Sequence, residues 1–171
     1  MNIKTIDDFI GLEELDIILD NTIRDIYFPF FYYDDKVQAL NKNSSQHHNY
    51  QLVHTFYIDG RPNSDRIHLF NSIFNNLNVG SLCKVKMNLQ MKSEELLEFE
   101  YHCDMGSEFK NCKTAVFYLN DNNGYTKFED GQIVQSKKNR CVIFDQNIPH
   151  TGSTCTDSKY RLVLNVNYYE K

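Results

Sequence analysis

The spacing of apolar residues changes at about residue 82, and this change constrains the fold more than any other feature of the chain. Val85, Met87 and Leu89 alternate with Lys, Asn and Gln residues. An apolar residue at every second position is typical of a strand whose two faces meet different surroundings. In most soluble sheets the polar face meets water, whereas at the mouth of a barrel it lines a site.

Further short apolar runs follow in the second half of the chain, and turn residues separate them. Asn and Gly supply such turns because both tolerate positive φ. Short strands that follow helices predict a mostly β fold, a double-stranded β-helix (jelly roll, cupin-like) with N-terminal helices packed on it. The strands are expected at 113–120, 132–135, 140–144 and 161–168, and the turns at Asn123-Gly124 and Gly131.

The first part of the chain has the spacing of amphipathic helices. Apolar residues recur at intervals of three and four between Ile6 and Ile23, and Ser64 is a suitable N-cap for a further helix that Gly80 ends. One domain therefore covers residues 1–171. It consists of a helical support and lid region at 1–80 and a jelly-roll catalytic core at 81–171.

Two features of the first part leave alternatives open. The aromatic run 27–33 either belongs to the core or forms a surface on which a substrate stacks. The polar run 41–51 is expected to be a surface loop. His47 and His48 within it are expected to be solvated rather than metal-bound, because neighbouring residues of an extended chain point in opposite directions.

Composition narrows the class of protein. A chain of 171 residues forms one ordinary domain. Its five cysteines are odd in number and lack C-x-x-C spacing, which predicts reduced thiols in the cytoplasm. No apolar run reaches the length of a membrane span, so we expect a soluble protein. The net charge of -5 argues against non-specific nucleic-acid binding but allows a local basic patch.

The most informative group of polar residues is a His-x-Asp step followed by a second His. His102 and Asp104 are two residues apart and point to the same face of an extended segment. His150 follows 46 residues after Asp104. Two imidazoles and one carboxylate form the ligand set of a non-haem Fe(II) site with open coordination positions.

The last expected strand adds a cation to the interior. Arg161 shares one strand face with Val163 and Asn165, and no carboxylate next to it in the sequence neutralises it. A ligand carboxylate bound by both arms of the guanidinium would do so. The open positions of the metal are enough for a bidentate 2-oxo acid and dioxygen.

Five stretches of the second half, taken together, resemble the 2-oxoglutarate and Fe(II)-dependent dioxygenases. The nearest likeness is to the prolyl-4-hydroxylase-like branch and its small viral and bacterial members. The likeness covers about residues 84–169, and the N-terminal half takes no part in it. The stretches are Tyr-His-Cys-Asp (101–104), Thr-Ala-Val-Phe-Tyr-Leu-Asn (114–120), Asn-Asn-Gly-Tyr-Thr-Lys-Phe-Glu-Asp-Gly (122–131), Ile-Phe-Asp-Gln-Asn-Ile-Pro-His-Thr-Gly (143–152) and Arg-Leu-Val-Leu-Asn-Val-Asn-Tyr (161–168).

The resemblance implies a role for each matching residue. His102, Asp104 and His150 would bind Fe(II). Arg161 would bind the distal carboxylate of 2-oxoglutarate. The chain departs from the branch in the spacing between the second His and this cation, which is 11 residues instead of nine. Further contacts to the cosubstrate are expected from Tyr118, Asn165, Asn88 and Thr126.

The resemblance also implies a reaction. With O2, 2-oxoglutarate would be converted to succinate and CO2 while an organic substrate is hydroxylated, and ascorbate is a further candidate cofactor. A prolyl residue of a peptide or protein is the substrate that the likeness favours, in the cytoplasm, or in the host cytoplasm if the protein is viral. A free amino acid, another small metabolite or a nucleobase remains an alternative.

Three rival classes of function use the same residues differently. A cupin-like metal-binding module or metal-dependent isomerase would share the jelly roll without needing Arg161 inside it. A thiol hydrolase would combine Cys141, Asp145 and His150. A regulatory protein with a decayed site would have lost ligands, whereas all three ligands are present here.

Overall fold

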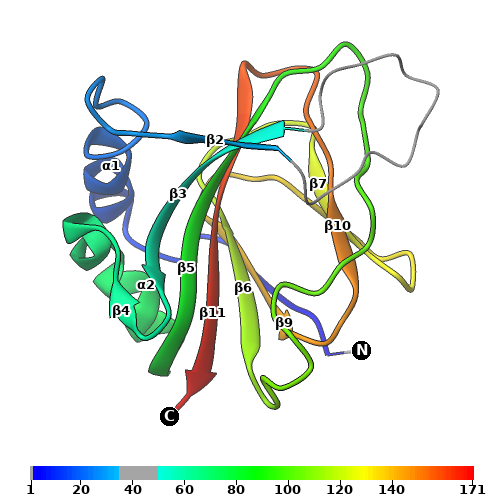
Figure 1. The fold of residues 1–171 in the computed structure, drawn as a ribbon. Coiled ribbons are helices and arrows are strands. Elements are labelled where there is room, and N and C mark those ends of the chain that lie inside the picture. The colour runs from blue at the N-terminus through cyan, green and yellow to red at the C-terminus, as the bar shows by residue number, and fades with distance from the viewer. Residues whose placement is uncertain (1, 35–49) are drawn as a thin grey trace.

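The computed structural model describes residues 2–34 and 50–171, which form three layers (Figure 1). A layer of helices covers one face of a large antiparallel sheet, and a small sheet covers part of the other face. The order of strands in the large sheet is β1-β9-β6-β11-β5-β3-β2, with β4 paired to β3. These strands are β1 (Lys4–Ile6), β2 (Phe31–Asp34), β3 (Tyr50–Ile58), β4 (Arg61–Pro62), β5 (Val79–Met91), β6 (Lys113–Tyr118), β9 (Arg140–Asp145) and β11 (Tyr160–Glu170).

The small sheet has three strands in the order β10-β7-β8. Its apolar side packs on the inner face of the large sheet, where Phe128 and Val134 meet Tyr118, Val142 and Val163. The two sheets together make the jelly roll that the strand pattern predicted. The strands of the small sheet are β7 (Tyr125–Phe128), β8 (Ile133–Gln135) and β10 (His150–Gly152).

The helices cover the outer face of the large sheet (Figure 1). They are α1 (Leu12–Asp20), the 3-10 helix η1 (Asp65–Phe70) and α2 (Asn71–Asn76). Ser64 caps η1 as expected, because its side chain accepts a hydrogen bond from the Arg66 N–H. None of these helices is long and apolar enough to span a membrane, within the ranges that the structure describes.

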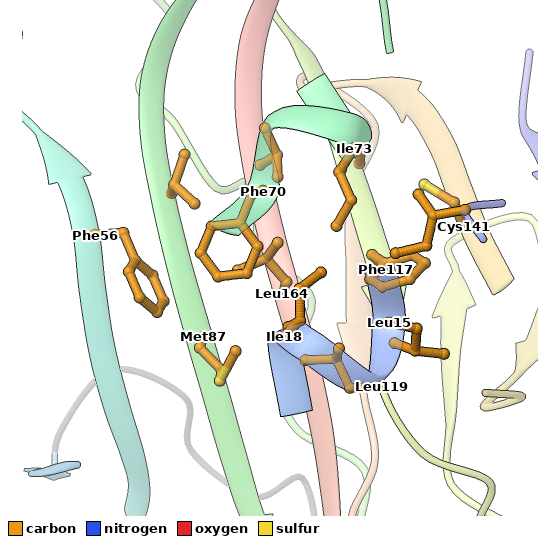
Figure 2. Close-up of a cluster of buried hydrophobic side chains, with 14 of the residues drawn as sticks. Leu15, Ile18, Phe56, Phe70, Ile73, Met87, Phe117, Leu119, Cys141 and Leu164 are labelled. Carbon is orange, nitrogen blue, oxygen red and sulfur yellow. The ribbon is translucent and has the colours of Figure 1, made fainter. Parts of the chain in front are cut away.

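The main core lies between these helices and the sheet (Figure 2). Leu15 and Ile18 of α1 reach the same cluster as Phe117 of β6, Met87 of β5 and Leu164 of β11. All five side chains are almost inaccessible to water. The even-numbered residues of β11 therefore face the helices, and the odd-numbered residues face the interior of the jelly roll.

The N-terminal region contributes strands as well as helices, so the predicted support at 1–80 is only partly helical. Weak alternation at 51–58 predicts a strand, and β3 covers this stretch. β1, β2, β3 and β4 all lie in this region, and Ile6 belongs to β1, where it pairs with Cys141 of β9. Helical spacing was the wrong interpretation here because the pairing partner lies far away in the sequence. Gly80 does not end the helix but lies inside β5. The residue with positive φ after the helix is Asn78.

The aromatic run 27–33 is divided between core and surface. Phe28 is buried, whereas Tyr27 and Tyr32 are well exposed and Tyr33 lines the pocket described below. The run is therefore neither wholly core nor wholly surface. Most of the predicted polar loop, with His47 and His48, lies outside the described residues.

Candidate metal centre

The two histidines of the predicted ligand set face each other across a short antiparallel bridge. The N–H of His102 donates to the carbonyl of His150, and the N–H of His150 donates to the carbonyl of His102, both at 3.0 Å. His150 begins β10, whereas His102 lies in the connection 92–112 between β5 and β6. The main chain thus aligns the two imidazoles, whose ring centroids are 4.9 Å apart.

Buried hydroxyl groups attach the start of this connection to the chain around β10. Thr154 Oγ1 accepts from the Leu97 N–H at 3.0 Å and lies 2.5 Å from Ser93 Oγ. The Thr151 hydroxyl donates to the carbonyl of Phe99 at 2.7 Å. Because buried polar groups are costly to leave unpaired, these contacts fix the path of the chain up to the first ligand.

The three predicted ligands meet at one point. Asp104 Oδ1 lies 3.9 Å from His102 Nε2, and Asp104 Oδ2 lies 3.9 Å from His150 Nε2. One ligand atom from each residue lies within 4.8 Å of the others. Neighbouring ligand atoms bound to one metal at about 2.1 Å lie about 3.0–3.4 Å apart, so a small inward movement of these side chains brings all three onto a single ion.

Main-chain carbonyls determine which ring nitrogen faces the ion. His102 Nδ1 lies 3.1 Å from the carbonyl of Glu100, and His150 Nδ1 lies 3.2 Å from that of Ile148. The proton of each neutral ring is therefore assigned to Nδ1, which leaves the Nε2 lone pair for a metal. Burial lowers the pKa of His150, because desolvation outweighs the attraction of Asp104, and the ring is neutral at pH 7.

The Asp104 carboxylate is held in its charged form. Burial opposes its ionisation, but the positive charges that His150 and His102 carry when protonated, with the Lys84 ammonium, outweigh this effect and lower the pKa of Asp104. Asn167 Nδ2 donates to Asp104 Oδ2 at 3.3 Å, and the same amide lies 2.9 Å from Thr114 Oγ1. Asn167 thus orients the carboxylate from behind, as outer residues of metal sites do.

The donor set itself indicates which metal fits. Two imidazoles and one carboxylate suit Fe(II) in a site with open positions, whereas structural zinc sites have four protein ligands. Within residues 2–34 and 50–171, this is the only group of three such ligands close enough to share an ion. The residues present therefore fit a catalytic non-haem iron better than a structural zinc.

Arg161 lies in the same pocket with only 6% of its surface exposed. Its Nε donates to Ser136 Oγ at 2.9 Å, and its Nη2 donates to Thr126 Oγ1 at 3.2 Å. Burial lowers the pKa of Arg161, and no described carboxylate forms an ion pair with it. The Nη1 group has no acceptor in the described part of the chain. A ligand carboxylate would supply one.

A second donor lies beside this guanidinium. Thr126 Oγ1 accepts from the Tyr118 hydroxyl at 2.8 Å as well as from Arg161. A hydroxyl oxygen accepts two hydrogen bonds and donates one, so the Thr126 proton is free to point into the pocket. Tyr118 is fully buried behind Thr126 and does not line the pocket.

Solved structures with the same architecture share little sequence with this chain. A viral collagen prolyl hydroxylase from Paramecium bursaria Chlorella virus-1, solved with 2-oxoglutarate, superposes with a TM-score of 0.60 and 14% identity over 98% of this chain and 95% of that one. The non-haem α-ketoglutarate-dependent epimerase SnoN of nogalamycin biosynthesis gives 0.68 and 14%, over 98% and 78%. An oxidoreductase of the 2OG-Fe(II) oxygenase family from Burkholderia pseudomallei gives 0.63 and 11%, over 97% and 84%.

The chain has the fold of the 2-oxoglutarate and Fe(II)-dependent oxygenases. In sequence, it matches no protein-family model and no curated protein. The fold class predicted from the strand pattern is confirmed. Because the structural neighbours include both a prolyl hydroxylase and an epimerase, they agree on the fold and the cosubstrate but not on the substrate.

The pocket of this oxygenase fold has a volume of about 500 Å³ and lies between the two sheets. The metal ligands and Thr126 form one side of it, and the inner faces of β5 and β11 form the other. Lys84, Lys86, Asn88 and Gln90 all line the pocket. The polar face of the first predicted strand therefore lines a site instead of meeting bulk water.

Three amide side chains in the pocket lack hydrogen-bond donors. Asn88 Oδ1 and Asn165 Oδ1 are buried without a partner, and so is Gln90 Oε1, which the sequence analysis did not single out. A buried acceptor without a donor costs roughly 1–3 kcal/mol. Three such acceptors in one pocket indicate that it binds a polar ligand, although the individual roles of Asn88 and Asn165 remain predictions.

Two further residues of the site were not predicted as functional. Asn167 lies two positions beyond Asn165 on the same strand face. That position in the sequence could have indicated that its side chain also faces the site. Gly124 was assigned to a turn that needs positive φ, but its φ is not positive. A Cβ there would lie 2.6 Å from Thr154 O and 2.7 Å from Arg161 Cδ, so glycine is required by close packing against the guanidinium side chain.

The additional residues between His150 and Arg161 form a turn that hydrogen bonds hold in place. The N–H of Asn123 donates to Asp157 Oδ1 at 2.9 Å, and the N–H of Thr156 donates to Asn123 Oδ1 at 2.9 Å. The turn ends before β11, whose pairing with β5 runs without a shift from Tyr160 to Asn167. Arg161 therefore keeps its inward orientation. The longer spacing is therefore compatible with a guanidinium inside the pocket.

The thiol-hydrolase alternative is wrong. Cys141 is fully buried in the core on the helix side of the sheet, whereas His150 faces the opposite side. Burial raises the pKa of Cys141, and Asp145 forms an ion pair with Lys113. No nucleophile is therefore available at this position.

Proposed function

We propose that the protein is an Fe(II)- and 2-oxoglutarate-dependent oxygenase that hydroxylates an organic substrate. One observation carries this proposal: the His-Asp-His group and a buried guanidinium without a carboxylate share one pocket. A metal-binding module of the cupin type would need the three ligands but not the cation. The buried Arg161 therefore favours a diacid cosubstrate over a simple metal store.

Three residues would bind the metal, and neighbouring groups orient them. His102, His150 and Asp104 would hold the iron, which, when bound, supplies the reaction of O2 with the 2-oxo acid. Asn167 keeps the carboxylate ligand oriented. The Nδ1–H bonds to main-chain carbonyls keep both Nε2 atoms directed at the ion.

The cosubstrate would be bound at its distal end. Arg161 and Thr126 both line the pocket and are hydrogen-bonded to each other, so the free Nη1 and the unused hydroxyl proton would both donate to that carboxylate. Tyr118 would act through Thr126, because it lies behind the pocket wall. The amides of Asn88 and Asn165 would donate or accept along the length of the diacid.

The test is conversion of 2-oxoglutarate to succinate and CO2 in the presence of Fe(II) and O2, with and without ascorbate. We expect Arg161→Ala to abolish succinate formation while calorimetry still detects binding of Mn(II). Arg61→Ala, which removes an exposed arginine from β4, is the matched control and should leave turnover unchanged. Undiminished succinate formation by Arg161→Ala would contradict the proposal, and metal binding without any succinate would favour a cupin-like module.

A prolyl residue of a peptide is the first substrate to test, because the resemblance in the second half of the chain favours it. Free amino acids, other small metabolites and nucleobases are the alternatives. Incubation of the enzyme with peptides or a cell extract, followed by mass spectrometry, should show a substrate that gains the mass of one oxygen atom.

A further inference from the structure

The polar face of β5 changes in character along the strand. Gln90 pairs with Arg161 of β11, whereas Lys84 pairs with Asn167. Six residues of a strand span about 20 Å, so these two pairs lie at opposite ends of the pocket wall. Asn167 contacts the metal ligand Asp104. Lys84 is therefore at the metal end, and Arg161 is at the other end.

The Lys84 ammonium is a cation of the pocket whose charge reaches Asp104 without a direct contact in the described part of the chain. It lines the pocket and is half-buried, yet it makes no hydrogen bond and no ion pair. Its charge lowers the pKa of Asp104, the pocket carboxylate that a bound metal would occupy. Lys86 lines the same wall two residues further along.

A bound metal would increase the excess of positive charge at this end. A divalent ion with one carboxylate ligand keeps a net positive charge, to which the Lys84 ammonium adds. A partly buried ammonium is stabilised by an anion that binds beside it. The distal carboxylate of 2-oxoglutarate cannot be that anion if it is bound at Arg161. The carboxylate beside its oxo group would offset the remaining charge of the ion, so the Lys84 ammonium would still need an anion of its own.

We propose that Lys84 binds an anionic group, a carboxylate or a phosphate, of the substrate that is oxidised. This inference rests on the proposed function, because it concerns the second molecule in the pocket and not the cosubstrate. Lys84 is then a specificity residue. An internal prolyl residue fits only when an acidic group lies close to it, whereas a free imino acid or a phosphorylated metabolite carries its own anion.

The experiment compares probes that differ only in charge. The protein is loaded with Mn(II) and 2-oxoglutarate without O2, so that the Arg161 end is filled. It is then titrated with N-acetyl-L-proline and neutral N-acetyl-L-prolinamide, and with glycerol 3-phosphate and glycerol. The two pairs separate a carboxylate from a phosphate as the preferred anion.

We expect the anionic member of at least one pair to bind about tenfold more tightly than its neutral partner, as one charge-assisted contact allows. Lys84→Met should abolish this preference, and Lys84→Arg should retain most of it. Lys92→Met removes an exposed lysine just beyond β5 and should retain it fully. Equal binding of charged and neutral probes by the native protein, or an unchanged preference in Lys84→Met, would overturn the inference.

Two further measurements keep the result interpretable. The melting temperature of Lys84→Met should match that of the native protein, and both proteins are compared at saturating Mn(II) and 2-oxoglutarate, which excludes misfolding and incomplete loading as the cause. If 2-oxoglutarate is turned over but no charge preference exists, only this inference fails. If the preference depends on Lys84 but succinate never forms, the proposed function fails and the anion site stands.

Discussion

The two faces of the large sheet are built by the same strands but have opposite properties. On the outer face, Leu164 and its neighbours pack against α1 and α2, and the cluster is apolar and closed (Figure 2). On the inner face of the same strand, Arg161 has no carboxylate partner and Asn165 has a buried oxygen without a donor. The comparison shows that one face stabilises the fold, while the other keeps polar groups unpaired for ligands.

The largest expected effect follows from removing a ligand on the inner face. Asp104→Ala should reduce succinate formation by more than the roughly 10–100-fold that loss of an outer residue of a metal site costs. It should also remove stabilisation by metal, which for the native protein is about 2.7 kcal/mol at a metal concentration of 100 times Kd. Thermal unfolding with and without Mn(II) measures the second effect. If the melting temperature of the variant still rises with Mn(II), Asp104 is not a ligand.

The next effect belongs to the outer face. Leu164→Ala deletes a buried side chain and should lower the free energy of unfolding by about 2–5 kcal/mol. Denaturant titration checks this value. Because the side chain points away from the pocket, the affinity for 2-oxoglutarate at low temperature should be unchanged. A large loss of affinity in a folded variant would mean that the two faces are not separate.

Gly124→Ala tests the position where packing and binding meet. The new methyl group would lie too close to the Thr154 carbonyl and the Arg161 side chain, so one of them must move. We expect a loss of about 1–3 kcal/mol in stability, as for overpacked sites, together with weaker 2-oxoglutarate binding. Calorimetry and thermal unfolding measure the two effects. Gly131→Ala, in open space but at positive φ, is a comparison that should affect stability alone.

The smallest expected effect comes from Asn165→Leu. This change replaces an amide whose buried oxygen has no donor, so the free energy of unfolding should stay within about 1 kcal/mol of the native value or increase. Binding of the cosubstrate should nevertheless weaken. Denaturant titration and calorimetry on the same preparation decide the outcome. A strongly destabilised variant would show that the amide has a structural role.

Much of the inner face could be predicted from the sequence because the spacing of residues in a strand determines their direction. The alternation in β5 and β11 predicted both faces correctly. His102 and Asp104 meet as predicted, although only His102 is paired with another segment and Asp104 lies in a bend. Spacing alone could not predict that His150 lies beside this pair. That prediction came from the five stretches that, in their order along the chain, resemble the oxygenase family. The geometry now shows all three together.

Other parts depended on contacts that spacing does not contain. β1 pairs with β9 near the other end of the chain, so its strand character could not be recognised locally. The sequence predicted a glycine-dependent turn at Gly124 but not why glycine is needed there. The reason is the close approach of Thr154 and Arg161, which only the fold brings about. The contact of Asn167 with Asp104 could not be predicted either, because it depends on the path of the connection between β5 and β6 that carries Asp104.

The reciprocal hydrogen bonds between His102 and His150 have a consequence for how the active site can vary. Backbone amides hold the imidazoles in position, and amides are the same whatever side chains surround them. Residues that follow Asp104, such as Met105 and Gly106, line the pocket without taking part in that attachment. Substrate preference can therefore diverge among descendants of this protein while the arrangement of the candidate metal ligands is inherited intact.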